Sequence, residues 1–293
     1  MLVTRIAAVA VTLSLGACAT SFHRPLTAEN KQRIQSVDVR MVIPQESFMV
    51  SARSPGVSMV TGGGLIGAMI DSGIQKSRQT EMAGEIRATV GSLAQFDFRH
   101  EADIALQTAV KESVVSKGLP FNIRSAEVWA AVPGKTESEK LFANTSGGTA
   151  VMMLSVHYAL EPGLGAFTTR TSAVLRQDGK MTPSFQAAAV YQMPLPAGSR
   201  DSVLAQLTAN DGKLLRSYMR ESVSETLRMV ALDWEGAAAG SSPAPGRTLP
   251  AYRFITGGGR MLDLPASTLA MAEDRVVVRD ETGTLFSLQK ERK

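Results

Sequence analysis

The sequence predicts an α+β fold, in which a mixed or antiparallel sheet with a three-stranded meander carries helices on one face. Three observations lead to this prediction. Residues 149–194 contain three runs in which apolar and polar residues alternate, with turn residues between them. Segments on both sides of this region have apolar residues at helical spacing. Short alternating runs near the C-terminus add a small β-hairpin module.

The meander is the most clearly patterned part of the chain. Its first strand is expected over residues 150–161, with alternate apolar residues on one face, and a Gly-Leu-Gly turn follows it. The second strand covers residues 167–177 and ends at Asp178 and Gly179, a pair that accepts the positive backbone angles of a tight hairpin. The third strand returns over residues 182–193.

Shorter elements are expected before the meander. Strands are expected where apolar residues alternate, and helices where they recur every three or four positions. The expected elements are strands over residues 36–43 and 47–52, helices over 72–93 and 99–116, an irregular strand pair over 121–132 and a short helix over 136–142.

A long helical region follows the meander. Ser199 can cap a helix that begins at Arg200. The Asn-Asp-Gly run at residues 210–212 is expected to break this helix, and a longer helix then continues to Trp234. The apolar stripe of this second helix consists of Leu214, Leu215, Met219, Val223, Leu227 and Val230.

The chain is expected to contain two folded units. Residues 235–250 are rich in Ala, Gly, Ser and Pro, a composition that predicts a linker between an α+β domain at 36–234 and a small β module at 251–293. The module is barely large enough for a core, so we expect it to dock on the main domain or on a partner. Its expected strands lie at residues 253–255, 275–278 and 284–288.

The first residues predict export. Arg5 gives a short positive start, and residues 6–15 form an apolar run too short to span a bilayer as a permanent helix. These features indicate a signal peptide over residues 1–17. The run ends at Leu15-Gly16-Ala17-Cys18, which resembles the lipobox of bacterial lipoproteins, where a hydrophobic and two small residues precede the lipidated cysteine.

This resemblance implies cleavage before Cys18 and attachment of lipids, palmitate among them, to that residue. By analogy with lipoproteins of Gram-negative bacteria, Ala19 after the cysteine indicates the outer membrane, with the folded part facing the periplasm. Residues 18–35 are polar and mixed, and are expected to form a tether that lifts the folded part off the membrane. The alternative is a secreted or membrane-anchored protein with a chance cysteine.

Cysteine content and charge exclude several function classes. Cys18 is the only cysteine, so its lipidation would leave no thiol for a disulfide, a nucleophile or a metal site. Removing residues 1–17 takes away the charge of Arg5 and lowers the formal net charge from +4 to +3. The charges are mixed along the chain, and no basic run interleaved with aromatic residues predicts nucleic-acid binding.

A glycine-rich segment at residues 62–67 matches the G-x-G-x-x-G pattern of dinucleotide sites. Such a site also needs an acidic residue after a parallel strand, whereas Glu81 and Glu85 lie inside an expected helix, so no cofactor is expected. One interpretation is a tight loop with close helix packing. The other is a small-residue face that is buried in a partner or a membrane. The candidate interaction residues are Gly63, Gly64 and Gly67.

No catalytic residue and no metal ligand is predicted. His157 and Glu161 share a strand face but lie roughly 13 Å apart at the usual rise of a strand. His100 lies near a helix start, and Glu137 and Glu139 are typical of an exposed helix start, where acidic residues are favoured. The chain has no G-x-S-x-G motif.

These patterns favour a non-enzymatic envelope lipoprotein that acts as an accessory or assembly subunit, with an unidentified protein partner. Two alternatives stay open. An enzyme acting on envelope material would be indicated by two carboxylates gathered around a cleft. A carrier of lipid or of a small molecule would be indicated by a large apolar cavity between the sheet and the helices.

Overall fold

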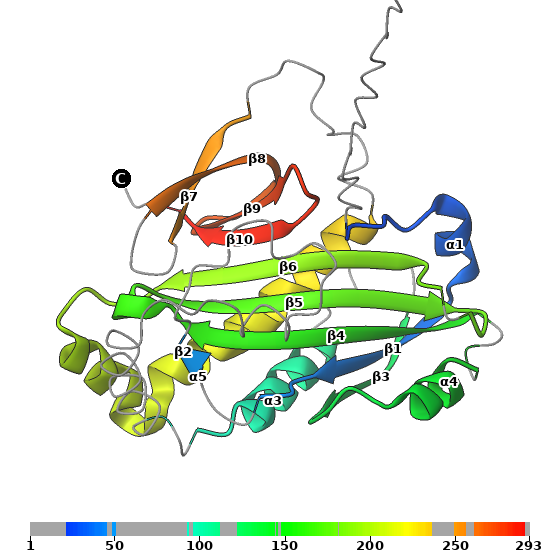
Figure 1. Cartoon of the computed structure of the whole chain (residues 1–293), viewed down its shortest axis with the longest axis horizontal. Coiled ribbons are helices and arrows are strands. Elements are labelled where there is room, and N and C mark those ends of the chain that lie inside the picture. The colour runs from blue at the N-terminus through cyan, green and yellow to red at the C-terminus, as the bar shows by residue number, and fades with distance from the viewer. Residues whose placement is uncertain are drawn as a thin grey trace, which may run out of the picture.

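A large mixed sheet forms the centre of the molecule, and helices cover one of its faces (Figure 1). The computed structural model describes residues 22–45, 49–50, 93, 96–111, 122–143, 145, 148–180, 182–235, 249–255 and 261–290. This arrangement confirms the α+β class. The sheet is larger than the predicted meander.

Ten strands make up this sheet, which runs in the order β3-β1-β4-β5-β6-β10-β9-β8-β7, with β2 paired to β4 off this path. Strand β1 pairs in parallel with both β3 and β4, and β10 pairs in parallel with β6. The strands are β1 Ser36–Val42, β2 Met49–Val50, β3 Asn122–Trp129, β4 Thr149–Leu160, β5 Ala166–Gln177, β6 Phe185–Pro194, β7 Ala251–Ile255, β8 Met261–Met271, β9 Arg275–Asp280 and β10 Leu285–Gln289.

The predicted meander is confirmed as strands β4, β5 and β6, which pair antiparallel in sequence order. A short 3₁₀ helix, Pro162–Leu164, makes the first reversal. At the second, Asp178 and Gly179 both have positive φ, 58° and 65°. Two central residues with positive φ are typical of a type I′ turn, whose twist matches that of the flanking strands.

Helices α3, Phe98–Lys111, and α5, Arg200–Trp234, cover the same face of the sheet (Figure 1). Alternate residues of β4 are buried against this layer, and the ring of Tyr158 stacks on Phe98 at 3.4 Å between centroids. The predicted stripe of α5 is confirmed, with Leu214 half-buried and the others buried: Leu215, Met219, Val223, Leu227 and Val230. Helix α4, Lys135–Ala143, matches the predicted short helix.

The predicted cap and break of α5 are also present. The side chain of Ser199 accepts a hydrogen bond from the backbone N–H of Ser202. Residues 209–212 leave the helical conformation, and Gly212 has φ +69°. A Cβ atom at Gly212 would lie 3.0 Å from the ring of Phe96, so both the backbone angle and the packing require glycine.

The irregular strand pair expected over residues 121–132 is wrong, because a single strand, β3, occupies this region. Strand β3 lies at the edge of the sheet, and its residues are half-buried or exposed. The pairing with β1 shifts register between Val37 and Asp38. An edge position and a bulge both blur the apolar alternation from which strands are predicted.

The C-terminal part contains four strands, where three runs were expected. Strand β8 was missed, and it contains Pro265, a residue that argues against a strand. Because β10 pairs with β6, the C-terminal strands extend the main sheet. They also share a small core with β6, made by Val190, Leu264, Ala266, Val276, Val278, Phe286 and Leu288.

The segment at residues 22–33 packs on the body, although it was expected to belong to a tether. Arg24 forms an antiparallel bridge with Gln186 at the start of β6. Helix α1, Ala28–Arg33, follows, and Thr27 caps it by accepting a hydrogen bond from the N–H of Asn30. Specific backbone pairing and capping therefore hold residues that composition alone assigned to a solvated tether.

Some predictions fall partly or wholly outside the described residues. Of the strand expected over residues 47–52, only β2 is described. Of the helix expected over residues 72–93, only Leu93 is described, and it is helical and buried. The signal peptide and most of the linker also lie outside. Within the described ranges, no helix is both long enough and apolar enough to cross a membrane.

Candidate functional site

Helix α5 joins three separate parts of the molecule through charged side chains. Its first half after the break contacts α3, its middle contacts the C-terminal strands, and its end contacts the N-terminal segment. Each contact is centred on one buried charged side chain. These are Glu101, Arg275 and Asp233, respectively. Buried charges are strongly destabilising without partners, so these three clusters fix how the elements fit together.

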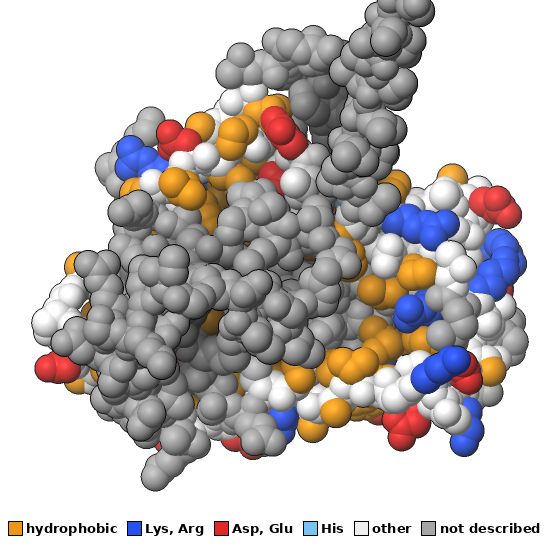
Figure 2. Space-filling model, in the orientation of Figure 1, with side chains coloured by type: hydrophobic (Ala, Val, Ile, Leu, Met, Phe, Trp, Pro, Cys, Tyr) orange, Lys and Arg blue, Asp and Glu red, His pale blue; other side chains and the backbone are white. Residues whose placement is uncertain are grey.

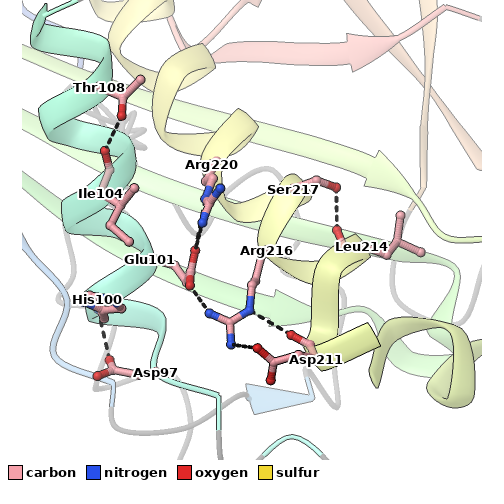
Figure 3. Close-up of polar contacts among 10 residues, drawn as sticks. All are labelled: Asp97, His100, Glu101, Ile104, Thr108, Asp211, Leu214, Arg216, Ser217 and Arg220. Atoms are coloured by element: carbon pink, nitrogen blue, oxygen red, sulfur yellow. Dashed lines mark hydrogen bonds and ion pairs between the residues drawn. The ribbon is translucent and has the colours of Figure 1, made fainter. Parts of the chain in front are cut away.

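The first cluster connects α3 to α5, as Figure 3 shows. Glu101 of α3 is buried and accepts hydrogen bonds from Arg216 and from Arg220, the latter at 2.9 and 3.0 Å. Arg216 also binds the carboxylate of Asp211 at 3.1 Å, and its guanidinium lies 5.0 Å from the ring centroid of Phe96. The two arginines and two carboxylates have no net charge together. This balance indicates that the cluster stabilises the packing of α3 against α5.

The second cluster surrounds Arg275 of β9, whose side chain is only 3% exposed. Its guanidinium donates to Glu221 at 3.1 Å, to the Oγ of Ser287 at 2.9 Å, and to the backbone carbonyls of Gln192 and Ser287. Ser287 in turn donates to Glu225 at 2.6 Å. The N–H groups of the Arg275 guanidinium thus connect α5, β6 and β10 through hydrogen bonds.

Burial shifts pKa values in this second cluster. It raises the pKa of Glu221 above its usual range, and the positive charge of Arg275 offsets part of that increase. Burial also raises the pKa of the Tyr191 hydroxyl, whose ring lies 4.4 Å below the guanidinium of Arg275. Both carboxylates lie on the helix side of the sheet, so the sheet separates them from the cavity described below.

The third cluster anchors the N-terminal segment. Asp233, near the end of α5, has a side chain that is 1% exposed. Its carboxylate lies 3.1 Å from the Nε2 atom of His23 and also accepts a hydrogen bond from Arg279 of β9. Nearby, the Nζ atom of Lys31 donates to the backbone carbonyl of Trp234 at 3.2 Å. Three distant segments of the chain therefore meet at one carboxylate.

The turn between β9 and β10 is shaped to fit this third cluster. Asp280 accepts hydrogen bonds from the backbone N–H groups of Thr282 and Thr284 at 2.9 and 2.8 Å, which closes the turn. Gly283 has φ +87°, and a Cβ atom there would lie 2.5 Å from the Cβ atom of His23. Glycine at this position allows the His23 side chain to pack directly against the turn.

A cavity of about 240 Å³ lies on the other side of the sheet, between the end of β6 and the C-terminal strands. Its lining is mainly apolar, with Pro194, Ile255, Met261 and Leu288 among the residues. Lys290 is also part of the lining, and its Nζ atom donates to the backbone carbonyl of Ala272. Ser287 and Leu288 point to opposite sides of β10, which separates this cavity from Glu221 and Glu225.

The structure describes only some of the residues that the sequence singled out as candidates. Cys18, Gly63, Gly64 and Gly67 lie outside the described residues. His157 lies beside Arg170 of β5, and burial together with that positive charge lowers the pKa of the imidazole. Arg170 pairs with the buried Glu161 at 3.4 Å, and burial raises the pKa of this carboxyl.

The helix-start residues His100, Glu137 and Glu139 lie on the surface. The backbone N–H of His100 donates to Asp97, and the carboxylate of Glu137 accepts from the N–H of Gly134. Glu139 lies 4.0 Å from Lys135 one turn away. Within the described ranges, no three His, Cys, Asp or Glu side chains are grouped in a way that could hold a metal ion.

Sequence reasoning missed the residues at the centres of the three clusters. Asp233 and Arg275 lie 42 positions apart by their numbers, and neither belongs to a recognisable motif. One signal was present: a charged residue next to the apolar stripe of a helix, as with Asp233 beside Val230, is unfavourable unless it is paired.

Comparison with known protein families and with curated proteins finds no match to this chain.

Proposed function

We propose that this protein is an outer-membrane lipoprotein anchored through Cys18, and that its α+β domain is a non-enzymatic accessory or assembly subunit of an envelope complex. The observation that carries the proposal is the Leu15-Gly16-Ala17-Cys18 motif at the end of an apolar run. The first described residue, Phe22, lies four positions after Cys18. The periplasm is then the compartment in which the domain works.

The buried charged clusters support a scaffold role. Glu101, Asp233 and Arg275 are all satisfied by partners from other elements of the same chain. Buried polar networks whose members are all satisfied can specify one arrangement of elements. A single arrangement of the elements gives a defined surface that a partner can recognise, as an assembly subunit requires.

The cavity beside β10 gives some support to the alternative of small-molecule carriage. Its volume of about 240 Å³ is below the low end of ligand pockets, roughly 300 Å³. It also lies on the side of the sheet opposite to the helices, whereas a carrier was expected to have its cavity between the sheet and the helices. The accessory-subunit proposal therefore accounts for more of the structure.

The proposal is tested by chemical crosslinking in intact cells, followed by purification of the protein and mass spectrometry of what copurifies. We expect a defined set of envelope proteins with the native chain. The matched control is Cys18→Ser, which we expect to remain an unlipidated precursor and to lose those partners. Recovery of abundant, unrelated envelope proteins alone from both chains would contradict an assembly role.

A further inference from the structure

The N-terminal segment pairs with the start of β6, on the side of this strand where β10 pairs further along; we call this side of β6 the β6 edge. Arg24 pairs with Gln186 at the start of β6, with backbone hydrogen bonds of 2.8 and 2.9 Å. Further along β6, Ala189 to Tyr191 pair with β10. The N-terminal segment and the C-terminal strands therefore share the same side of β6, as Figure 1 shows.

The chain leaves little distance between this edge and the proposed lipid anchor. Only Ala19, Thr20 and Ser21 separate Cys18 from Phe22, the first described residue. Four residue steps span at most about 14 Å when fully extended. If Cys18 is lipidated, as proposed above, the membrane surface must lie within about this distance of Phe22.

Exposed apolar side chains are found beyond the same edge. Of the four large apolar side chains that are exposed in the described part of the chain, three belong to β8: Met261, Leu262 and Met271, at 56%, 51% and 66%. Figure 2 shows hydrophobic side chains on the visible face of the C-terminal strands. The fourth, Val132 at 58%, follows β3 at the opposite edge of the sheet.

We propose that the membrane-proximal face of this protein is formed by residues 22–27 and strands β7–β10, and that this face contacts the lipid headgroup layer. The proposal rests on the lipid anchor at Cys18. The opposite edge, strand β3, then points away from the membrane. Five strand spacings of about 4.8 Å separate the N-terminal segment from β3, which amounts to roughly 24 Å.

The two tryptophans of the chain are natural probes of this orientation. Trp234 lies next to the N-terminal segment, since its carbonyl accepts a hydrogen bond from Lys31. Trp129 ends β3, at the far edge. The full mature protein, purified from membranes, is reconstituted into vesicles of phosphatidylethanolamine and phosphatidylglycerol that contain dansyl-labelled lipid. Energy transfer to the dansyl groups is then measured for Trp129→Phe and Trp234→Phe, each of which retains one tryptophan.

We expect transfer from Trp234 to be several-fold more efficient than transfer from Trp129. Met271→Glu should reduce the transfer from Trp234, while the matched control Val132→Glu should leave it unchanged. Equal transfer from both tryptophans, or stronger transfer from Trp129, in protein that is lipidated and floats with the vesicles would overturn the orientation alone. Protein that carries no lipid by mass spectrometry and does not float would overturn the lipid anchor and the orientation together.

Discussion

The Nε2 atom of His23 lies 3.1 Å from the Oδ2 atom of Asp233, although 210 positions separate the two residues in the chain. This contact places the start of the folded body against the end of α5. Arg279 of β9 binds the same carboxylate, so the N-terminal segment and the C-terminal strands are held at one point. The first described residues are therefore held by side chains from both α5 and β9.

Replacing Asp233 by alanine is expected to destabilise the protein strongly. The substitution removes a buried carboxylate together with its ion pair to Arg279, whose side chain is 13% exposed. Breaking a buried pair from one side typically costs about 3–5 kcal/mol. Urea unfolding followed by circular dichroism measures this loss. The control Asp263→Ala, on the exposed surface of β8, should change stability by less than about 0.5 kcal/mol. Similar losses of stability in the two variants would contradict a stabilising role for the buried Asp233 carboxylate.

Gly283→Ala is expected to lower stability more than Gly163→Ala. Both glycines have positive φ, +87° and +76°, so both variants bear the backbone cost of about 1–2 kcal/mol. Only at Gly283 would the new Cβ atom collide with His23, whereas nothing lies within 4 Å of a Cβ atom at Gly163. The difference between the two melting temperatures isolates the packing of His23 against the turn. Equal losses would mean that His23 does not pack there.

Arg275→Met is expected to cost at most about 3–5 kcal/mol, chiefly because Glu221 would lose its ion pair, whereas Glu225 keeps Arg228 at 3.2 Å. Adding Glu221→Gln and Glu225→Gln to this variant should recover much of the loss, since the carboxylates are then neutral. A double-mutant cycle from equilibrium unfolding gives the coupling energy. Effects that simply add would show that these residues act independently.

Stability near neutral pH is expected to depend on Glu221. Its pKa is raised in the folded state by burial, so the folded state holds this proton more tightly than the unfolded state does. The stability that Glu221 contributes is complete below its unfolded pKa and is lost as pH rises through the folded pKa. Glu221→Gln should therefore lose less stability than the native chain when pH is raised from about 4.3 towards neutral. Parallel stability profiles for the two chains would contradict this assignment.

Elements with a local pattern could be predicted from the sequence. The meander follows from strict alternation and from Asp178-Gly179, which has the two positive φ angles of its turn. Helix α5 and its break follow from the cap at Ser199 and from the Asn-Asp-Gly run, whose residues all have positive φ. In these cases the chemistry that determines the structure lies within a few neighbouring residues.

The elements and clusters that the sequence did not predict depend on contacts between residues far apart in the chain. Strand β8 contains Pro265 but is held by pairing with β7 and β9, which its own pattern does not reveal. Residues 22–33 are mainly polar, and their place on the body is set by contacts with Gln186, Asp233 and Trp234. The same holds for Arg275, whose carboxylate partners are on a helix about 50 positions earlier. Pairwise positions of this kind cannot be derived from local periodicity.

The lipid anchor at Cys18 is tested most directly by the mass of the N-terminal peptide of the protein purified from cell membranes. The proposed lipid anchor, based on the lipobox-like run Leu15-Gly16-Ala17-Cys18, predicts a mature chain that begins at Cys18, with a mass increased by diacylglycerol and a further fatty acyl group. A chain that begins elsewhere, or one that carries an unmodified Cys18, would contradict the lipid anchor and the membrane orientation that depends on it.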